Sequence, residues 1–109
     1  MEDRGRVVVV AAGFALWRGG RCVAAARWAD VERLIARQYS FPASEALALR
    51  VELIDGTQME LLEDAPGFDA FLDRAAVTLR GLTPYERWHS AVVSLSGDSL
   101  TVYERNTRR

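Results

Sequence analysis

The clearest alternation of apolar and polar positions lies between residues 47 and 62. Every second residue from 47 to 53 is large and apolar, which is the period of a half-buried strand. Residues 58–62 alternate in the same way, and Asp55-Gly56 stands between the two runs. Asp-Gly at this place is a strong hairpin signal, because a type I′ turn needs positive φ at both central residues. The pattern therefore predicts an antiparallel hairpin of residues 47–53 and 58–62.

After Pro66 the spacing of apolar residues changes to three or four, which predicts a helix with one buried face. Asp64 is its predicted N-cap, and Asp69 in the first turn suits the positive end of the helix dipole. Gly81 is predicted to follow the last turn. The apolar positions expected on the buried face are Phe68, Phe71, Leu72, Ala75, Ala76 and Leu79.

The other segments predict further strands and a second helix. Residues 7–10 are continuously apolar, which predicts a buried strand, and Gly19-Gly20 predicts the turn of another hairpin with a return strand over residues 21–28. Thr83, Pro84 and Glu86 form a capping box, so a short helix is expected from about residue 84 to about residue 91. Residues 100–103 predict a final strand.

Residues 28–39 fit two different structures. Val31, Leu34 and Ile35 would share one face of a helix, whereas every second residue from 31 to 39 would line one side of a strand. The periodicity alone mildly favours the helix. Phe41 is expected in the loop that follows, beside Pro42, where it either covers the edge of the core or anchors a partner.

Taken together, these patterns resemble a pleckstrin-homology-like (PH-like) domain of the uncharacterised kind found in small bacterial proteins. The motifs are GFALWRGGR at the first hairpin, Trp28-Ala29-Asp30-Val31, the Asp-Gly hairpin, EDAPGF at residues 63–68, and Trp88. The resemblance spans roughly residues 13–103. It implies an α+β fold in which a strongly bent antiparallel sheet is packed by one main amphipathic helix, with a short second helix, and it favours a strand over residues 28–39. Eukaryotic relatives bind phosphoinositides through basic clusters in the first hairpin loop, which here offers Arg18 and Arg21.

Composition narrows the classes of protein that fit. A chain of 109 residues, half of them apolar and 27% charged, is expected to form a single domain over residues 1–109. No apolar run approaches the ~20 residues of a membrane span, and no signal peptide is recognisable, so we expect a soluble protein without a membrane partner. Cys22 is the only cysteine, which predicts a reduced, cytoplasmic environment. A net charge of −1 argues against a nucleic-acid partner, because such proteins normally carry a basic stripe.

No arrangement of residues predicts catalysis, a cofactor or a metal. His89 is the only histidine, and as a general base it would need a nucleophile or an orienting acid. We expect it to have a partly buried structural role, and we expect Cys22 to be a buried, inert thiol. One cysteine and one histidine cannot complete a four-ligand zinc site. The sequence therefore predicts a protein that is not an enzyme.

One segment is strongly acidic. Residues 51–73 carry seven carboxylates and no arginine, whereas the segments before and after it each have a net charge of +3. Two interpretations stay open: a solvated face whose helix-start acids serve the dipole, or a docking surface for a basic partner. The predicted partner-binding residues on solvent-facing positions are Glu52, Glu60, Asp69 and Asp73, with Phe41 as an apolar anchor.

These observations favour a small non-enzymatic protein-interaction module whose partner has a basic surface. Its sharper form is an immunity-type protein that neutralises a bacterial toxin, since a small acidic domain can occlude the basic groove of a nuclease. The alternative is a ligand-binding or catalytic α+β domain with a pocket between sheet and helix. A pocket lined by His89 and arginines would favour that alternative.

Overall fold

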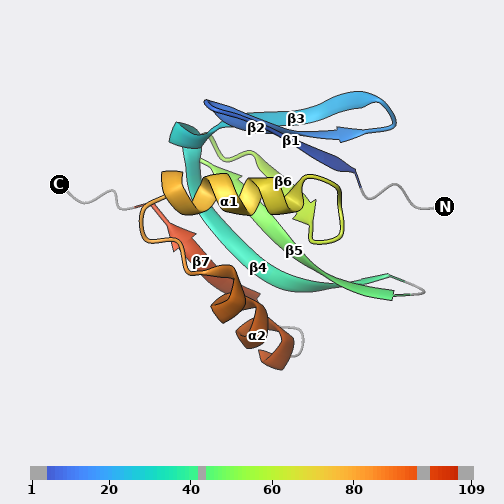
Figure 1. The fold of residues 1–109 in the computed structure, drawn as a ribbon, viewed down its shortest axis with the longest axis vertical. Helices are drawn as coiled ribbons and strands as arrows, with labels where there is room; N and C mark the ends of the chain where they lie inside the picture. Colours follow the sequence, from blue (N-terminus) through green and yellow to red (C-terminus); the bar gives the residue numbers. More distant parts are fainter. Residues whose placement is uncertain (1–4, 42–43, 96–98, 106–109) are drawn as a thin grey trace.

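The computed structural model describes residues 5–41, 44–95 and 99–105. Within these residues six strands come first along the chain, two helices follow them, and a last strand comes after the helices (Figure 1). In chain order the elements are β1 (Arg6–Val10), β2 (Gly13–Arg18), β3 (Arg21–Arg27), the 3-10 turn η1 (Trp28–Asp30), β4 (Val31–Phe41), β5 (Ser44–Leu53), β6 (Gln58–Leu62), α1 (Phe68–Thr78), α2 (Tyr85–Leu95) and β7 (Ser99–Glu104).

The strands form two antiparallel sheets, one in the order β1-β2-β3 and one in the order β6-β5-β4-β7. Figure 1 shows α1 lying across the molecule next to β1, with α2 at the end nearest β7. The α+β class is confirmed. The strong bend implied by the PH-like resemblance is not confirmed, because the strands divide between two sheets. No helix in the described ranges is long and apolar enough to cross a membrane.

The hairpin of β5 and β6 forms as predicted, with Val51 opposite Met59 and Leu49 opposite Leu61. Its loop is longer than the two-residue turn that Asp-Gly suggested. The Gly56 N–H donates to Leu53 O and the Leu53 N–H donates to Thr57 O, which is the bonding of a three-residue loop. Gly56 has a φ of 92°, and the Asp55 carboxylate accepts from the Thr57 N–H at 3.0 Å.

Residues 28–39 resolve into a single 3-10 turn followed by β4, so the helix that periodicity mildly favoured is wrong. β4 pairs with β5 on one side and with β7 on the other, and it is therefore a central strand. Pairing along both edges satisfies its backbone groups, and this tertiary gain overrides a weak local preference. Register shifts at Val31/Arg33 and Leu34/Ile35 account for the mixed apolar period of this segment.

The core lies between the sheets and the helices. Phe71 on α1 contacts Phe14 on β2 and Trp28 on η1, with ring centroids 5.0 and 5.3 Å apart. Phe68, Ala75 and Leu79 are buried on the same helix face, as the spacing predicts, and Leu72 is partly buried. Ala76 is exposed, which corrects the expected width of that face.

The start of α1 differs from the prediction. The N-cap is Gly67 rather than Asp64, and it makes no side-chain capping bond. The cause is the approach of β1: the Val7 N–H donates to Pro66 O at 2.8 Å, which draws the chain tightly across that strand. A residue with φ of 90° and no Cβ is needed at the crossing, and glycine supplies both.

Four smaller expectations are corrected. In β1 only Val7 is buried, because its neighbours alternate across a sheet that has one solvated face. Cys22 is exposed rather than buried, since it follows the hairpin turn at the sheet edge. Phe41 ends β4 instead of standing in a loop, and its side chain lies outside the described residues. The second helix begins at Tyr85 and continues to Leu95.

The crossing at Gly67 provides a prediction with an internal control. A Cβ at Gly67 would lie 1.9 Å from Val7 O, whereas a Cβ at Gly81, which has nearly the same positive φ, would meet nothing within 4 Å. Gly81→Ala is expected to cost about 1 kcal/mol of unfolding free energy, which is the backbone strain alone. Gly67→Ala is expected to cost about 3 kcal/mol or more, because β1 must also shift. Urea denaturation measures both, and equal losses would contradict the crossing.

Candidate functional site

Glu52 and Glu60 are held in ion pairs on the outer face of the four-stranded sheet. The Glu52 side chain is only 16% exposed, and its carboxylate accepts from Arg33 at 2.8 Å and from Arg50 at 3.5 Å. Glu60 pairs with Arg37 at 2.6 Å. Strand register explains the contact of Glu52, which lies opposite Arg33 on the neighbouring strand. Glu60 on β6 reaches Arg37 on β4 across the intervening strand β5. Both acids thus stand on the outer face of the sheet, where they are partly exposed and paired with arginines of the chain, and their role in partner binding stays a prediction.

Asp69 and Asp73 are exposed on α1, as predicted. They are four residues apart, so they are neighbours on one side of the helix. Leu49, Val51 and Leu61 alternate with the paired acids of the sheet and point into the core on which α1 packs. The four acids among the predicted site residues thus divide into two pairs on opposite sides of the four-stranded sheet.

A groove of about 660 Å³ runs between α1 and α2 and brings a third carboxylate to Asp69 and Asp73. This residue is Glu86, in the first turn of α2. None of the ion pairs within the described ranges involves any of the three. The apolar part of the lining is Leu72, Ala76, Leu82, Pro84 and Trp88.

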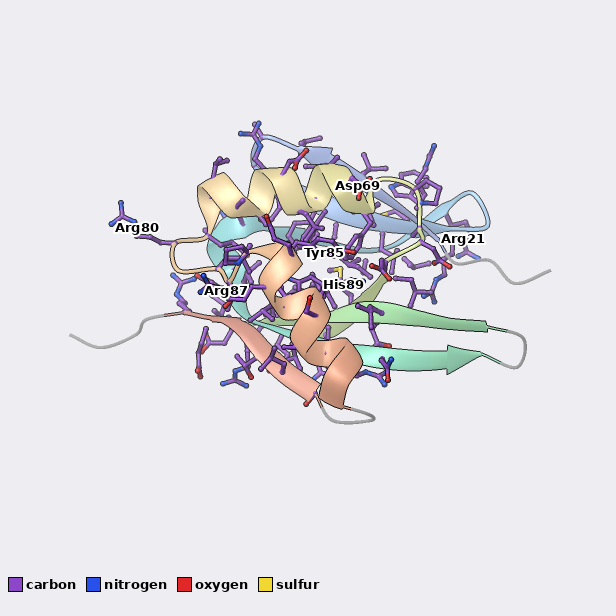
Figure 2. All side chains as sticks on the ribbon, turned by 60° about the horizontal axis from the view of Figure 1, so that its bottom comes forward. Arg21, Asp69, Arg80, Tyr85, Arg87 and His89 are labelled. Atoms are coloured by element: carbon purple, nitrogen blue, oxygen red, sulfur yellow. The ribbon has the colours of Figure 1, made fainter. Side chains whose placement is uncertain are left out.

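Arg80, just beyond the end of α1, and Arg87, on α2, lie outside the groove. Figure 2 shows Arg80 extended away from the end of α1 and Arg87 on α2, while Asp69 lies near Tyr85. Neither arginine belongs to the groove lining. The groove therefore presents negative charge above an apolar floor. Sequence reasoning assigned Glu86 only to helix capping, and the pairing of the two helices was needed to place it beside α1.

Trp88 forms part of the groove wall and is 1% exposed. Its indole Nε1 is buried and has no hydrogen-bond partner in the described part of the chain. A buried unsatisfied N–H of this kind costs about 1–3 kcal/mol.

Glu63 joins Tyr85 and His89 at one end of this site. The alternation that buries Met59 and Leu61 places Glu63 on the inner side of the sheet, facing α2. Its carboxylate accepts a short hydrogen bond from the Tyr85 hydroxyl and lies 3.3 Å from His89 Nε2. The two rings are 5.2 Å apart, and both are labelled on α2 in Figure 2. Glu63 is thus the orienting acid for His89 that the sequence alone did not identify.

The chemistry of this cluster is limited by protonation. Partial burial, the hydrogen bond to Glu63 and the charge of Asp69 together raise the pKa of Tyr85 well above its usual range. The phenol therefore stays protonated as a donor and is not a nucleophile at neutral pH. Within the described part of the chain, His89 contacts Glu63 and Tyr85, and neither supplies a nucleophile.

The carboxylates of this part of the molecule do not gather into a metal site in the described residues. Within residues 5–41, 44–95 and 99–105, no three His, Cys, Asp or Glu side chains lie close enough together to hold a metal ion. The three carboxylates of the groove are thus better placed to meet separate positive groups than to share one ion.

Comparisons with protein-family models, with curated proteins and with solved structures found no match to this chain. The PH-like resemblance accordingly stays a prediction.

The Glu63–Tyr85 bond predicts a distinctive titration. One of the three tyrosines should ionise above the usual range, and Glu63→Gln should lower that pKa because it removes the carboxylate charge. The folded state keeps this proton above pH ~10, where an unfolded tyrosine loses it. The bond therefore stabilises the fold fully below pH ~10, and this contribution is lost as the pH rises further.

Absorbance at alkaline pH measures the ionisation, and denaturation across pH measures the stability. In Tyr85→Phe the anomalous ionisation should disappear, and the loss of stability above pH ~10 should be smaller than in the unchanged protein. A titration that Glu63→Gln does not alter would contradict the bond.

Proposed function

We propose that this chain is a non-enzymatic protein-interaction module that binds a partner with a basic surface in the groove between α1 and α2. The observation that carries the proposal is the convergence of Asp69, Asp73 and Glu86 on one groove, without a basic partner among the described residues. Elsewhere, Glu52 and Glu60 are neutralised by arginines of the chain itself. In the groove, by contrast, three carboxylates stand together without an arginine in the lining.

The lining suits lysine and arginine side chains in particular. These side chains have apolar stems and charged ends, and here Leu72, Leu82 and Pro84 would contact the stems while the carboxylates meet the charges. Opposite charge across an interface accelerates association and selects partners more than it increases affinity. A basic segment in an extended or helical form therefore fits this groove better than a neutral ligand.

The stability of α1 supports a binding role for Asp73. Asp69 in the first turn is favoured by the helix dipole, whereas Asp73 gains no such benefit. Like charges four residues apart destabilise a helix by about 0.2–0.5 kcal/mol. A pair that slightly weakens its own helix is consistent with selection for an external contact.

In its sharper form, the proposal is that the chain is an immunity-type protein that acts in the cytoplasm by covering the basic surface of a toxin. The support is the combination of small size, a negative groove and an apolar floor. A nuclease would offer the complementary surface, since its substrate groove must attract phosphates.

One observation favours a second candidate, a catalytic role for His89. Glu63 orients its imidazole in the way that a general base requires. The groove lining, however, contains neither His89 nor an arginine, which were the residues expected of a catalytic pocket. A turnover that is lost in His89→Ala, with the fold retained, would establish this candidate and contradict the non-enzymatic proposal.

The proposal predicts the behaviour of charge-reversal variants in affinity capture. The unchanged chain, Asp73→Arg and Glu104→Arg would serve as baits in an extract of the native host, followed by identification of the captured proteins. Both substitutions change the net charge by the same amount, but Glu104 lies on β7, paired with Arg33, away from the groove. Asp73→Arg should abolish capture of a basic protein, and Glu104→Arg should retain it.

Association kinetics with the captured protein test the mechanism. Reversal of both Asp69 and Asp73 should slow association by about tenfold or more at low salt, and much less near 1 M salt, where the Debye length is ~3 Å. The free energy of unfolding of Asp73→Arg should stay within about 0.5 kcal/mol of that of the unchanged protein. A loss of binding in this variant would then not result from a loss of folding. If neither the double charge reversal nor the salt concentration changed the affinity, the proposal would be contradicted.

A further inference from the structure

The two sheets have four edges, and connecting segments cover two of them. β1 forms one edge of the three-stranded sheet, and its Val7 N–H donates to Pro66 O at 2.8 Å. β7 forms one edge of the four-stranded sheet, and its Val102 O accepts from the Thr83 N–H at 2.9 Å. The outer edges of β3 and of residues 58–61 in β6 have no such backbone partner in the part of the chain that the structure describes. These two edges are therefore open.

The two open edges border the same groove, which has a volume of about 660 Å³. Its lining includes residues 23–26 of β3 on one side and residues 57–59, at the start of β6, on the other. Successive side chains of a strand point to opposite faces, so a groove that touches four residues in a row meets β3 along its edge. The fully described strands β1 and β2 contribute nothing to the lining, so this is the edge that β2 leaves free.

Backbone donors and acceptors point from both strands toward this groove. The Trp28 N–H donates to Ala12 O at 3.1 Å, so Trp28 faces β2. In an antiparallel ladder every second residue bonds to the neighbouring strand, which turns Ala26 toward β2 and directs the N–H and C=O of Ala25 outward. On β6, the Glu63 N–H donates to Leu47 O on β5 at 2.8 Å, and the same alternation directs the backbone of Gln58 away from β5.

β3 lacks the features that normally protect a sheet edge. Such edges usually carry charged side chains, a proline or a bulge. The register shift beside Leu16 leaves Val23 as an extra residue, but residues 24–26 after it are three alanines in regular pairing. Residues 22–26 include no charged side chain and no proline. An edge of this kind readily accepts a further strand.

The side chains of the groove are mainly apolar. Val23 and Ile54, two of the four large apolar side chains that are exposed in the described residues, belong to its lining and are 53% and 55% exposed. The alanines of β3 are short and leave room above them for larger side chains. An added strand with large apolar residues at alternate positions would cover these side chains.

The charge of the groove is negative. Asp30 and Asp55 belong to the lining, which includes no arginine. Asp30 pairs with Arg27 at 3.3 Å, whereas no ion pair within the described ranges involves Asp55. The N–H and the hydroxyl of Thr57 donate to the Asp55 carboxylate and hold its pKa below the usual range, so that it is charged at neutral pH. A basic side chain on the occupant would complement this charge.

A second copy of the chain fits this edge poorly. Antiparallel pairing of β3 with its own copy about Ala24 would set Arg21 of each copy opposite Arg27 of the other. Like charges directly opposite one another destabilise a strand pair. Charge therefore favours a different protein as the occupant.

We propose that the groove between β3 and β6 binds an extended segment of another protein, which pairs with β3 as an added strand and carries apolar residues at every second position and a Lys or Arg near Asp55. Main-chain hydrogen bonds to Ala25 would hold the segment, and its apolar side chains would lie over the alanines of β3. The lining shares no residue with the groove between α1 and α2. The failure of either proposal would therefore leave the other intact.

The test uses a blocked peptide of the sequence Lys-Val-Thr-Val-Thr-Val-Thr and two N-methylated forms of it. One form carries methyl groups on the Val nitrogens and the other on the Thr nitrogens, so each removes the donors of one edge of the peptide and keeps its side chains. Titration of ¹H–¹⁵N shifts of the full chain locates the contact. The unmethylated peptide should shift resonances of β3 and slow hydrogen exchange of the Ala25 amide about tenfold or more. One methylated form should bind about tenfold or more weakly, and the other should bind like the unmethylated peptide.

Two matched variants test the same bond from the side of the protein. Ala25→Pro removes the outward N–H, and proline is tolerated on an edge strand where the N–H faces away from the sheet. This variant should bind the peptide about tenfold or more weakly. Ala25→Thr keeps the N–H and should retain binding. The ¹H–¹⁵N spectrum shows whether each variant is folded, and the methylated peptides decide the question if Ala25→Pro is not. Glu in place of the peptide's Lys should weaken binding by about threefold, because exposed charge pairs are weak.

Three results would overturn the proposal. The first is no binding of the unmethylated peptide at millimolar concentration, or shifts that fall on α1 and α2 instead of β3. The second is an equal effect of the two methylation patterns, since binding would then not depend on one edge of the peptide. The third is a dimer in solution that Ala25→Pro abolishes and Ala25→Thr retains, since this would assign the edge to a second copy.

Discussion

The contact of Phe71 with Phe14 and Trp28 is the interaction on which the rest of the structure depends. These rings come from α1, from the three-stranded sheet and from the turn that leads into the four-stranded sheet. Within the described residues the two sheets share no ladder, so their relative position depends on what packs between them. Aromatic pairs of this geometry contribute about 0.5–1.5 kcal/mol each beyond their burial. The close crossing of Gly67 over Val7 completes the arrangement, because it allows α1 to lie against β1.

This arrangement determines where the charges of the acidic segment act. The side chains of Glu52 and Glu60 point to the outer side of the sheet, where Arg33 and Arg37 of β4 form ion pairs with them. The Glu63 side chain points to the inner side of the sheet and accepts a hydrogen bond from Tyr85 on α2. Asp69 and Asp73 lie on the side of α1 that lines the groove, and the lining contains no arginine. A segment that looks uniformly acidic in sequence is thus divided among an ion-paired face, a hydrogen-bonded cluster and an open groove.

The groove between the helices is negative and is formed by side chains of α1, of α2 and of the segment between them. The net charge of −1 gives no indication of this groove. Charge distribution, rather than net charge, carries the functional information in this chain.

Local signals in the sequence determined the α+β class, the β5–β6 hairpin, the buried face of α1 and the exposure of Asp69 and Asp73. Each of these follows from a period or a turn residue within a few positions of chain. The tertiary structure alone decided the rest. β4 is a strand because β5 and β7 pair with it. Gly67 replaces Asp64 as the N-cap of α1 because β1 passes close by. The charge of Glu52 is neutralised because Arg33 lies opposite it. Glu63 reaches His89, and Glu86 reaches the groove, only when α2 has packed against the sheet. The physical reason is the separation of the residues along the chain. Periodicity within a short segment indicates which way a side chain points. Ion pairs, grooves and strand partners depend on residues that are far apart in the chain, and no local pattern determines that these residues approach one another.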